Sequence, residues 1–335
     1  MRLFSILGLL LPCLQTLSQE QVAPLFEKKD ILPITIETNL KLVLKEKAKS
    51  DIYHWANLSY LGEQRDTVSI PLKMKARGNF RLTSGTCNFP PLLINFPKKK
   101  IKHTLFEHQT KLKLVTQCID ADYVVREYMV YEIYNLITNL SFKARLAEVK
   151  YIDSLGKLKP KLNKGFFIEN ELDLSARLGA KNSYIKTLTI ARLDTLQMAT
   201  LVMFEYLIGN NDWSVPGLHN IKLFTKPGRW YLPVPYDFDH AGIVEAPYAL
   251  PPPQLDLGIT TVRERAYRGL DYSPEIFKQV FDKFNSIKPQ LYALYEGNPH
   301  LEPKYIKRTL KYFDDFYEEI NDPKAIKKYF RARRM

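Results

Sequence analysis

The chain has 335 residues, and its 49 Lys and Arg against 36 Asp and Glu give a formal net charge of +13. Hydrophobic residues make up 45% and charged residues 25%, which excludes a disordered tail, and 14 Gly exclude a collagen-like repeat. The length supports one large domain or two smaller ones. The basic balance favours an acidic partner, but it does not choose between nucleotide, nucleic acid, anionic polymer and membrane surface.

Residues 1–18 are predicted to be a signal peptide. Arg2 provides the positive start, an apolar stretch runs from Leu3 to Leu14, and Thr16 to Ser18 place small residues before the cleavage point. The stretch is too short for a comfortable transmembrane helix, and no later segment approaches a membrane span. We therefore expect an exported protein of the periplasm or cell envelope, with a lipid anchor at Cys13 as the alternative.

Two cysteines, Cys87 and Cys118, remain after the signal peptide is removed. In an oxidising compartment such a pair is a disulfide candidate, and two buried thiols are the alternative. A zinc site is not indicated, because no CxxC or HxxxH pattern accompanies the cysteines.

The front of the chain is predicted to be β-rich. Apolar and polar residues alternate from Ile34 to Leu44 and again from Val68 to Ala76. Shorter strands are expected from Lys111 to Val115, from Ala147 to Ile152 and from Gly165 to Glu169.

Helices are predicted between and after these strands. Apolar residues recur every three or four positions from Asp122 to Leu140, and a second helix should end at Ile208, before Gly209. Ser273 and Asp322 each precede a proline and should begin helices. This order is an α+β pattern, with a β-rich part containing one helix over residues 19–170 and a mostly helical part over residues 171–335.

A hairpin near the middle of the chain carries the most informative polar residues. Ile221 to Thr225 and Trp230 to Val234 are expected to pair around a Lys-Pro-Gly-Arg turn. This register places Asn220 opposite Pro235, with Asp237 at the same open end.

Asp212 lies in the loop that enters the hairpin, so folding should gather Asp212, Asn220 and Asp237, together with Asp239. Carboxylate and amide oxygens suit Mg²⁺, and phosphoryl transfer needs such a set. The alternative is that these residues cap turns or face solvent.

This stretch resembles the matching region of the spore-coat CotH family of atypical kinases. The shared order is Asp212, His219-Asn220, a hairpin and Pro235-Tyr236-Asp237, preceded by KARGN, KLKL, Arg126-Glu127 and GFFIE. The likeness spans about residues 73–270. The CNFPPL, KLKLV and PVPYDFD stretches are closer still to uncharacterised exported proteins of Bacteroidetes type.

The resemblance implies a two-lobed kinase-like core and a site for Mg²⁺ and ATP. Asp212 would be the acidic residue of the catalytic loop, and Asn220 and Asp237 would hold the metal. The other implied roles fall to four residues: Lys113 on the phosphates, Glu127 holding Lys113, Arg77 covering the phosphates and Glu169 at the adenine side. For Lys113 and Glu127 the alternative is an exposed ion pair, and for Glu169 it is a surface carboxylate.

Two features count against a working kinase: there is no GxGxxG or GxxxxGK[ST] loop, and an exported protein meets little ATP. A catalytically silent structural or interaction protein of the envelope is therefore the second hypothesis. A phosphodiesterase or nuclease is the third, and no sequence-specific nucleic-acid motif is present. The substrate implied is a protein or an acidic envelope component. Arg263, Arg265 and Arg268 would either bind a phosphate or acidic substrate, or pair with Glu264, Asp271 and the metal-site acids.

Overall fold

The computed structural model describes residues 22–45, 51–78, 81, 85–87, 89–185, 188–228 and 230–332. The predicted signal peptide and Asn79 lie outside these residues. No helix in the described part of the chain has the length and apolar character needed to cross a membrane.

Strands of the front half close into a barrel in the order β1-β2-β3-β4-β5-β7-β6. Neighbouring strands are antiparallel, except that β1 runs parallel to β6 and so closes the barrel. The strands are β1 (Leu32–Thr38), β2 (His54–Leu61), β3 (Thr67–Ala76), β4 (Leu92–Asn95), β5 (Lys111–Thr116), β6 (Ala144–Asp153) and β7 (Lys161–Ile168).

The barrel closes around its own hydrophobic core. Along β3, Ile70, Leu72 and Met74 are buried and the residues between them are exposed, as expected for a strand with one face inward. Leu58 and Leu112 reach the same core from β2 and β5. Alternation of apolar residues thus gives each strand its inner face.

The back half combines helices with a small sheet of order β10-β9-β8. The strands of this sheet are β8 (Lys181–Ser183), β9 (Ile221–Thr225) and β10 (Leu232–Pro235). The α-helices described along the chain are α1 (Leu40–Lys45), α3 (Ala121–Ile137), α4 (Glu171–Leu178), α5 (Thr195–Ile208), α6 (Pro274–Ser286), α7 (Lys288–Tyr295), α8 (Pro303–Asn321) and α9 (Pro323–Tyr329). Single 3-10 turns are η1 (Pro24–Phe26), η2 (Lys98–Lys100), η3 (Ile190–Arg192) and η4 (Pro253–Leu255).

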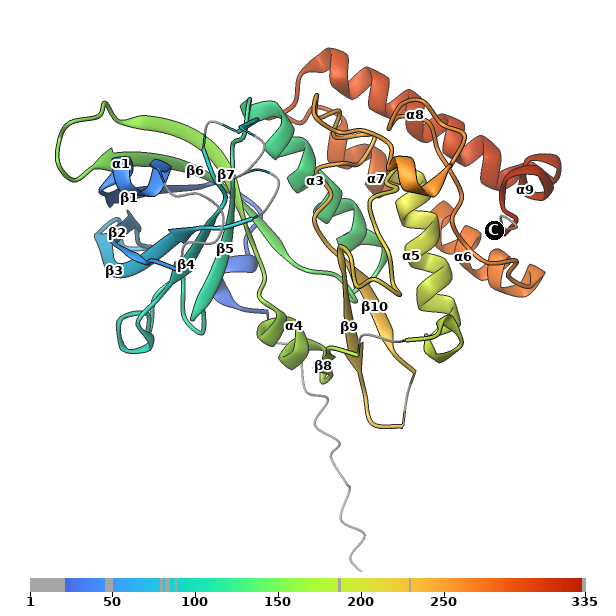
Figure 1. The fold of residues 1–335 in the computed structure, drawn as a ribbon, viewed down its shortest axis with the longest axis horizontal. Helices are drawn as coiled ribbons and strands as arrows, with labels where there is room; N and C mark the ends of the chain where they lie inside the picture. Colours follow the sequence, from blue (N-terminus) through green and yellow to red (C-terminus); the bar gives the residue numbers. More distant parts are fainter. Residues whose placement is uncertain are drawn as a thin grey trace, which may run out of the picture.

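Helix α3 joins the two halves. It lies between the barrel and the other helices, with the β9–β10 hairpin below it in the view of Figure 1. Its buried apolar side chains belong to the second hydrophobic core, which also takes Val115, Leu146 and Phe166 from barrel strands. The outer face of β5, β6 and β7 is therefore covered by the helical half, and both halves share this core.

The expected two-lobed kinase-like core is wrong, although the mixed α+β class is confirmed. The front half is a closed seven-stranded barrel, and the helices lie mostly in the C-terminal region. The parallel contact between β1 and β6 makes the difference, because it joins the two edges that an open sheet would leave. Alternation along a strand shows which face is buried, but not which strand it pairs with.

Most predicted elements are present near their expected positions, and one is of the wrong type. The alternation from Ile34 continues only to Thr38, and Leu40–Lys45 is helix α1. The Asn39 side chain accepts a hydrogen bond from the backbone N–H of Leu42 at 3.3 Å, and Asp153 accepts one from Leu40 at 3.1 Å. These contacts satisfy the first N–H groups of a helix, where a period-two pattern predicts strand.

Cys87 and Cys118 form a disulfide that spans 31 residues. Of the two alternatives for these cysteines, the structure has the bonded one. The bond ties the segment after β3 to the chain just before α3.

Candidate functional site

The loop that carries Asp212 begins where α5 ends. Gly209 adopts a left-handed conformation with φ 69°, and a Cβ there would approach the Tyr312 hydroxyl oxygen to 2.5 Å. Both facts require glycine. The Asn210 side chain then accepts a hydrogen bond from the backbone N–H of Asp212 at 3.0 Å, which sets the direction of the loop.

The hairpin register differs by one residue from the expected one. Pro235 lies opposite Ile221, and the N–H of Tyr236 donates to the carbonyl oxygen of Asn220 at 3.0 Å. Asn220 and Asp237 both have positive φ, at 53° and 66°. Backbone strain of this kind often occurs at functional sites, and here it marks both residues that end the hairpin.

Asp212 contacts the two residues that precede β9. One carboxylate oxygen lies 2.8 Å from Nε2 of His219, and the other accepts from the Asn220 amide at 3.1 Å. The same amide nitrogen donates to the Asp212 carbonyl oxygen at 2.8 Å. Because the amide nitrogen faces Asp212, Oδ1 of Asn220 is the atom left to bind a cation.

A cavity of about 370 Å³ opens beside these residues. Together with the expected Asp239, five of the seven residues to which the resemblance gave a role line it: Arg77, Lys113, Asp212, Asn220 and Asp237. The barrel thus contributes the cations and the hairpin region contributes the acids. The remaining lining residues are Gly78, Arg81, Pro91, Val115, Leu218, His219, Tyr236 and His240.

Glu127 has a different partner from the expected one. It forms an ion pair with Arg81 at 2.7 Å, and Arg81 also contacts Asp239 at 3.0 Å. No ion pair between Glu127 and Lys113 occurs among the described residues. Burial raises the pKa of Glu127, with Asp239 and Asp237 adding to the effect and Arg81 opposing it.

Sequence reasoning missed Arg81, which lies two residues after the KARGN stretch that carried the resemblance. The acidic residues of the sequence did indicate that a further cation was needed. Once Glu127, Asp237 and Asp239 are expected at one place, their carboxylates require a nearby cation in addition to Lys113.

Lys113 lies close to the acids without a hydrogen bond to them. Burial, and the positive charge of Arg77, lower the pKa of Lys113 to about 8. Its ammonium lies over the Tyr236 ring, 5.2 Å from the centroid. Burial and the Asp239 carboxylate raise the pKa of Asp237. Both shifts have the direction expected where nearby opposite charges do not fully offset the burial of a charge, which is common at functional sites.

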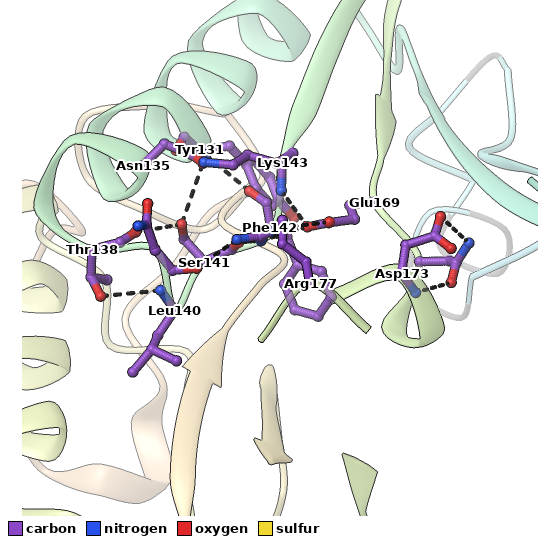
Figure 2. A network of polar contacts seen from close by, with 12 residues as sticks. Tyr131, Asn135, Thr138, Leu140, Ser141, Phe142, Lys143, Glu169, Asp173 and Arg177 are labelled. Atoms are coloured by element: carbon purple, nitrogen blue, oxygen red, sulfur yellow. Dashed lines mark hydrogen bonds and ion pairs between the residues drawn. The ribbon is translucent and has the colours of Figure 1, made fainter. Parts of the chain in front are cut away.

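Glu169, expected at the adenine side, does not line the cavity and forms a buried ion pair with Arg177 instead. Figure 2 shows it within a polar network between α3, the chain before β6, and α4. Both carboxylate oxygens bind Arg177, at 3.0 and 2.9 Å, and one also accepts from the backbone N–H of Lys143 at 3.0 Å. Arg177 donates to the carbonyl oxygens of Asn139 and Ser141 as well. The alternative of a surface carboxylate is wrong, since both side chains of the ion pair are 1% exposed.

The three downstream arginines do not pair with Glu264 or Asp271 in the described structure. Arg263 forms an ion pair with Glu245, and Arg265 stacks on the Tyr312 ring at 3.6 Å from the centroid. Arg268 donates to the carbonyl oxygens of Asn211 and Trp213, at 2.8 and 2.7 Å. Arg268 therefore holds the two residues on either side of Asp212.

The residues present suit a divalent cation only in part. Among the described residues no group of three or more His, Cys, Asp or Glu is placed to hold a metal. Asp237 and Asn220 supply a carboxylate and an amide oxygen, with Asp239 close enough to shift the pKa of Asp237. Mg²⁺ is commonly held by one or two carboxylates together with substrate phosphates. This set fits an ion that arrives with a phosphate ligand rather than alone.

Comparison with known proteins adds no relative: no family model matches the chain, and no curated protein is similar to it at a significant level.

Proposed function

We propose that the protein is an exported phosphotransferase that uses Mg²⁺ and ATP. One observation carries the proposal: Asp212, Asn220 and Asp237 line the same cavity as Lys113 and Arg77. Acids and an amide for a metal thus face cations for phosphates across one small space. The resemblance to the CotH family supports the same roles for these residues.

In the proposed reaction Lys113 and Arg77 bind phosphate oxygens, which replace the backbone cradle of a glycine-rich loop. Asn220 and Asp237 would hold the metal, and a metal bound there would neutralise charge on the phosphates. Asp212 orients an acceptor hydroxyl and takes its proton. The hydroxyl oxygen forms a bond to the γ-phosphorus as the bond from that phosphorus to the bridging oxygen breaks, and ADP leaves.

Export is part of the proposal and rests on two features. The N-terminal stretch has the composition of a signal peptide, and Cys87 and Cys118 form a disulfide, a bond that persists in oxidising compartments.

A labelled-phosphate assay tests the proposal. The chain from residue 19 onward is incubated with Mg²⁺ and ATP labelled at the γ-phosphate, with its own hydroxyl groups, added proteins and water as acceptors. We expect phosphate release or transfer above background. Asp212→Asn should abolish it while nucleotide binding remains, and Asp237→Asn should abolish both. Asp282→Asn, an exposed residue of α6, is the matched control and should leave activity unchanged.

A catalytically silent binding protein of the envelope is the second candidate. It is favoured by Arg81, whose guanidinium already pairs with Glu127 and Asp239 at the cavity wall. In that case the wild type would show no affinity for ATP with Mg²⁺, and Asp212→Asn would behave like the wild type in every assay.

A further inference from the structure

A second charged region of the molecule lies around Glu245, which forms ion pairs with three arginines. Its carboxylate receives Arg126 from α3 at 3.0 Å, Arg308 from α8 at 2.9 Å, and Arg263 from the loop before α6. Asp122 supplies a second carboxylate, 3.8 Å from Arg126, so two negative charges face three positive ones. The cluster keeps a surplus of positive charge that another anion would reduce.

Arg263 and Arg308 have N–H groups that do not contact Glu245 and could bind a further anion. A guanidinium carries five N–H groups. Arg263 uses Nη1 on Glu245, and Arg308 uses Nη2 and, at 3.5 Å, Nε. Their side chains are 32% and 48% exposed, so both are partly open to solvent. Arg126, by contrast, is 8% exposed, and it also pairs with Asp122 at 3.8 Å.

These two arginines line a groove of about 790 Å³ between α8 and the loop before α6. Lys311 and Arg265 add positive charge to its wall, and Tyr312 adds an aromatic face. Lys311 has no ion-pair partner among the described residues. A groove with convergent cations and an aromatic wall suits a ligand that has both carboxylates and carbon-rich surface.

The acids of the groove restrict the kind of ligand. Glu264 and Glu319 lie on its wall with Asp315, but two of them are already engaged. Glu264 accepts from Thr260 and Thr261, and Glu319 accepts from the Tyr206 hydroxyl at 2.9 Å. Their charges still repel a polymer with dense negative charge. An anion with few, spaced charges avoids this repulsion.

We propose that this groove binds an acidic polypeptide segment, with a Glu or Asp side chain seated between Arg263 and Arg308. The site is separate from the candidate phosphotransfer cavity, and the two share no lining residue. The inference therefore stands or falls independently of the proposed function.

Fluorescence anisotropy of a labelled short peptide in which Glu alternates with Ser tests the proposal. The wild type should bind this peptide, and the affinity should fall with added salt. The same peptide with Gln in place of Glu should bind at least about tenfold more weakly. No binding of the Glu peptide, or equal binding of the Gln peptide, would overturn the proposal.

Variants then locate the site. Lys311→Glu reverses a charge that makes no ion pair in the described structure, so the fold should survive, and the affinity should fall about tenfold or more. Arg308→Gln should act in the same direction. The double variant Lys98→Gln/Lys99→Gln removes two exposed charges at η2 on the barrel and should change little. If the groove variants and the barrel double variant lost equal affinity, net charge alone would account for the attraction of the peptide. Tighter binding of an anionic polysaccharide than of the peptide would contradict the choice of ligand.

Discussion

The molecule contains two buried glutamate–arginine pairs that differ in how fully their charges and polar atoms are compensated. Glu169 and Arg177 satisfy each other, and their remaining atoms bind backbone groups (Figure 2). Glu127 and Arg81 lie among further acids, and Oε1 of Glu127 has no hydrogen-bond partner in the described structure. The first pair is what a stable interior requires, whereas the second leaves charge uncompensated at a cavity.

The largest expected effect lies at the fully compensated pair. Arg177→Met would leave Glu169 charged and buried, and would strip the carbonyl oxygens of Asn139 and Ser141 of a donor. We expect a loss of about 3–5 kcal/mol in the free energy of unfolding, measured by urea denaturation. Arg192→Met, at an exposed position, should cost less than about 0.5 kcal/mol. A small loss of unfolding free energy in Arg177→Met would contradict the difference stated between the two glutamate–arginine pairs.

The second largest loss in the free energy of unfolding is expected when the disulfide is removed. Replacing Cys87 and Cys118 by Ser opens a loop of 31 residues, for which chain entropy predicts a loss of about 3–4 kcal/mol. The loop includes Lys113 and ends just before the helix that carries Glu127. We therefore expect ATP affinity to fall as well, while unchanged affinity would show that the cavity does not depend on this bond.

Lys113 should show the opposite effect on stability, because burial of its positive charge opposes folding. Its pKa is lowered to about 8, so between pH 8 and its ordinary pKa of 10.5 the folded chain binds fewer protons than the unfolded chain. Stability from this group therefore rises with pH across that range. Lys113→Met should stabilise the fold by about 2–3 kcal/mol at pH 7 and abolish ATP binding.

The control for Lys113→Met is the pH dependence itself. The difference in unfolding free energy between variant and wild type, measured by thermal denaturation, should shrink from pH 8 upward. A difference that stays constant would mean that packing rather than charge accounts for it.

The smallest effect on stability is expected at His219. Its ring contacts Asp212 at 2.8 Å, but the side chain is 57% exposed, so the pair contributes little to the fold. His219→Gln should change the free energy of unfolding by less than about 1 kcal/mol. Because Asp212 takes the acceptor's proton in the proposed reaction, the same variant should lower phosphate transfer. Full activity would show that His219 does not assist Asp212.

The sequence allowed prediction of those parts of the site that lie close together along the chain. Asp212, Asn220 and Asp237 belong to one loop and hairpin, so local spacing sufficed to place them. Arg81 and Asp239 are 158 residues apart, and nothing local to either predicts their contact. The barrel escaped prediction for the same reason, because its closure depends on β1 meeting β6 across the whole front half.

Isothermal titration of a nonhydrolysable ATP analogue tests the central claim most directly. In Mg²⁺ the wild type should bind the analogue, and binding should weaken at least about tenfold in EDTA. Asp237→Asn should show little affinity in either condition. Wild-type protein that does not bind the analogue, or binds it equally with and without Mg²⁺, would contradict the account.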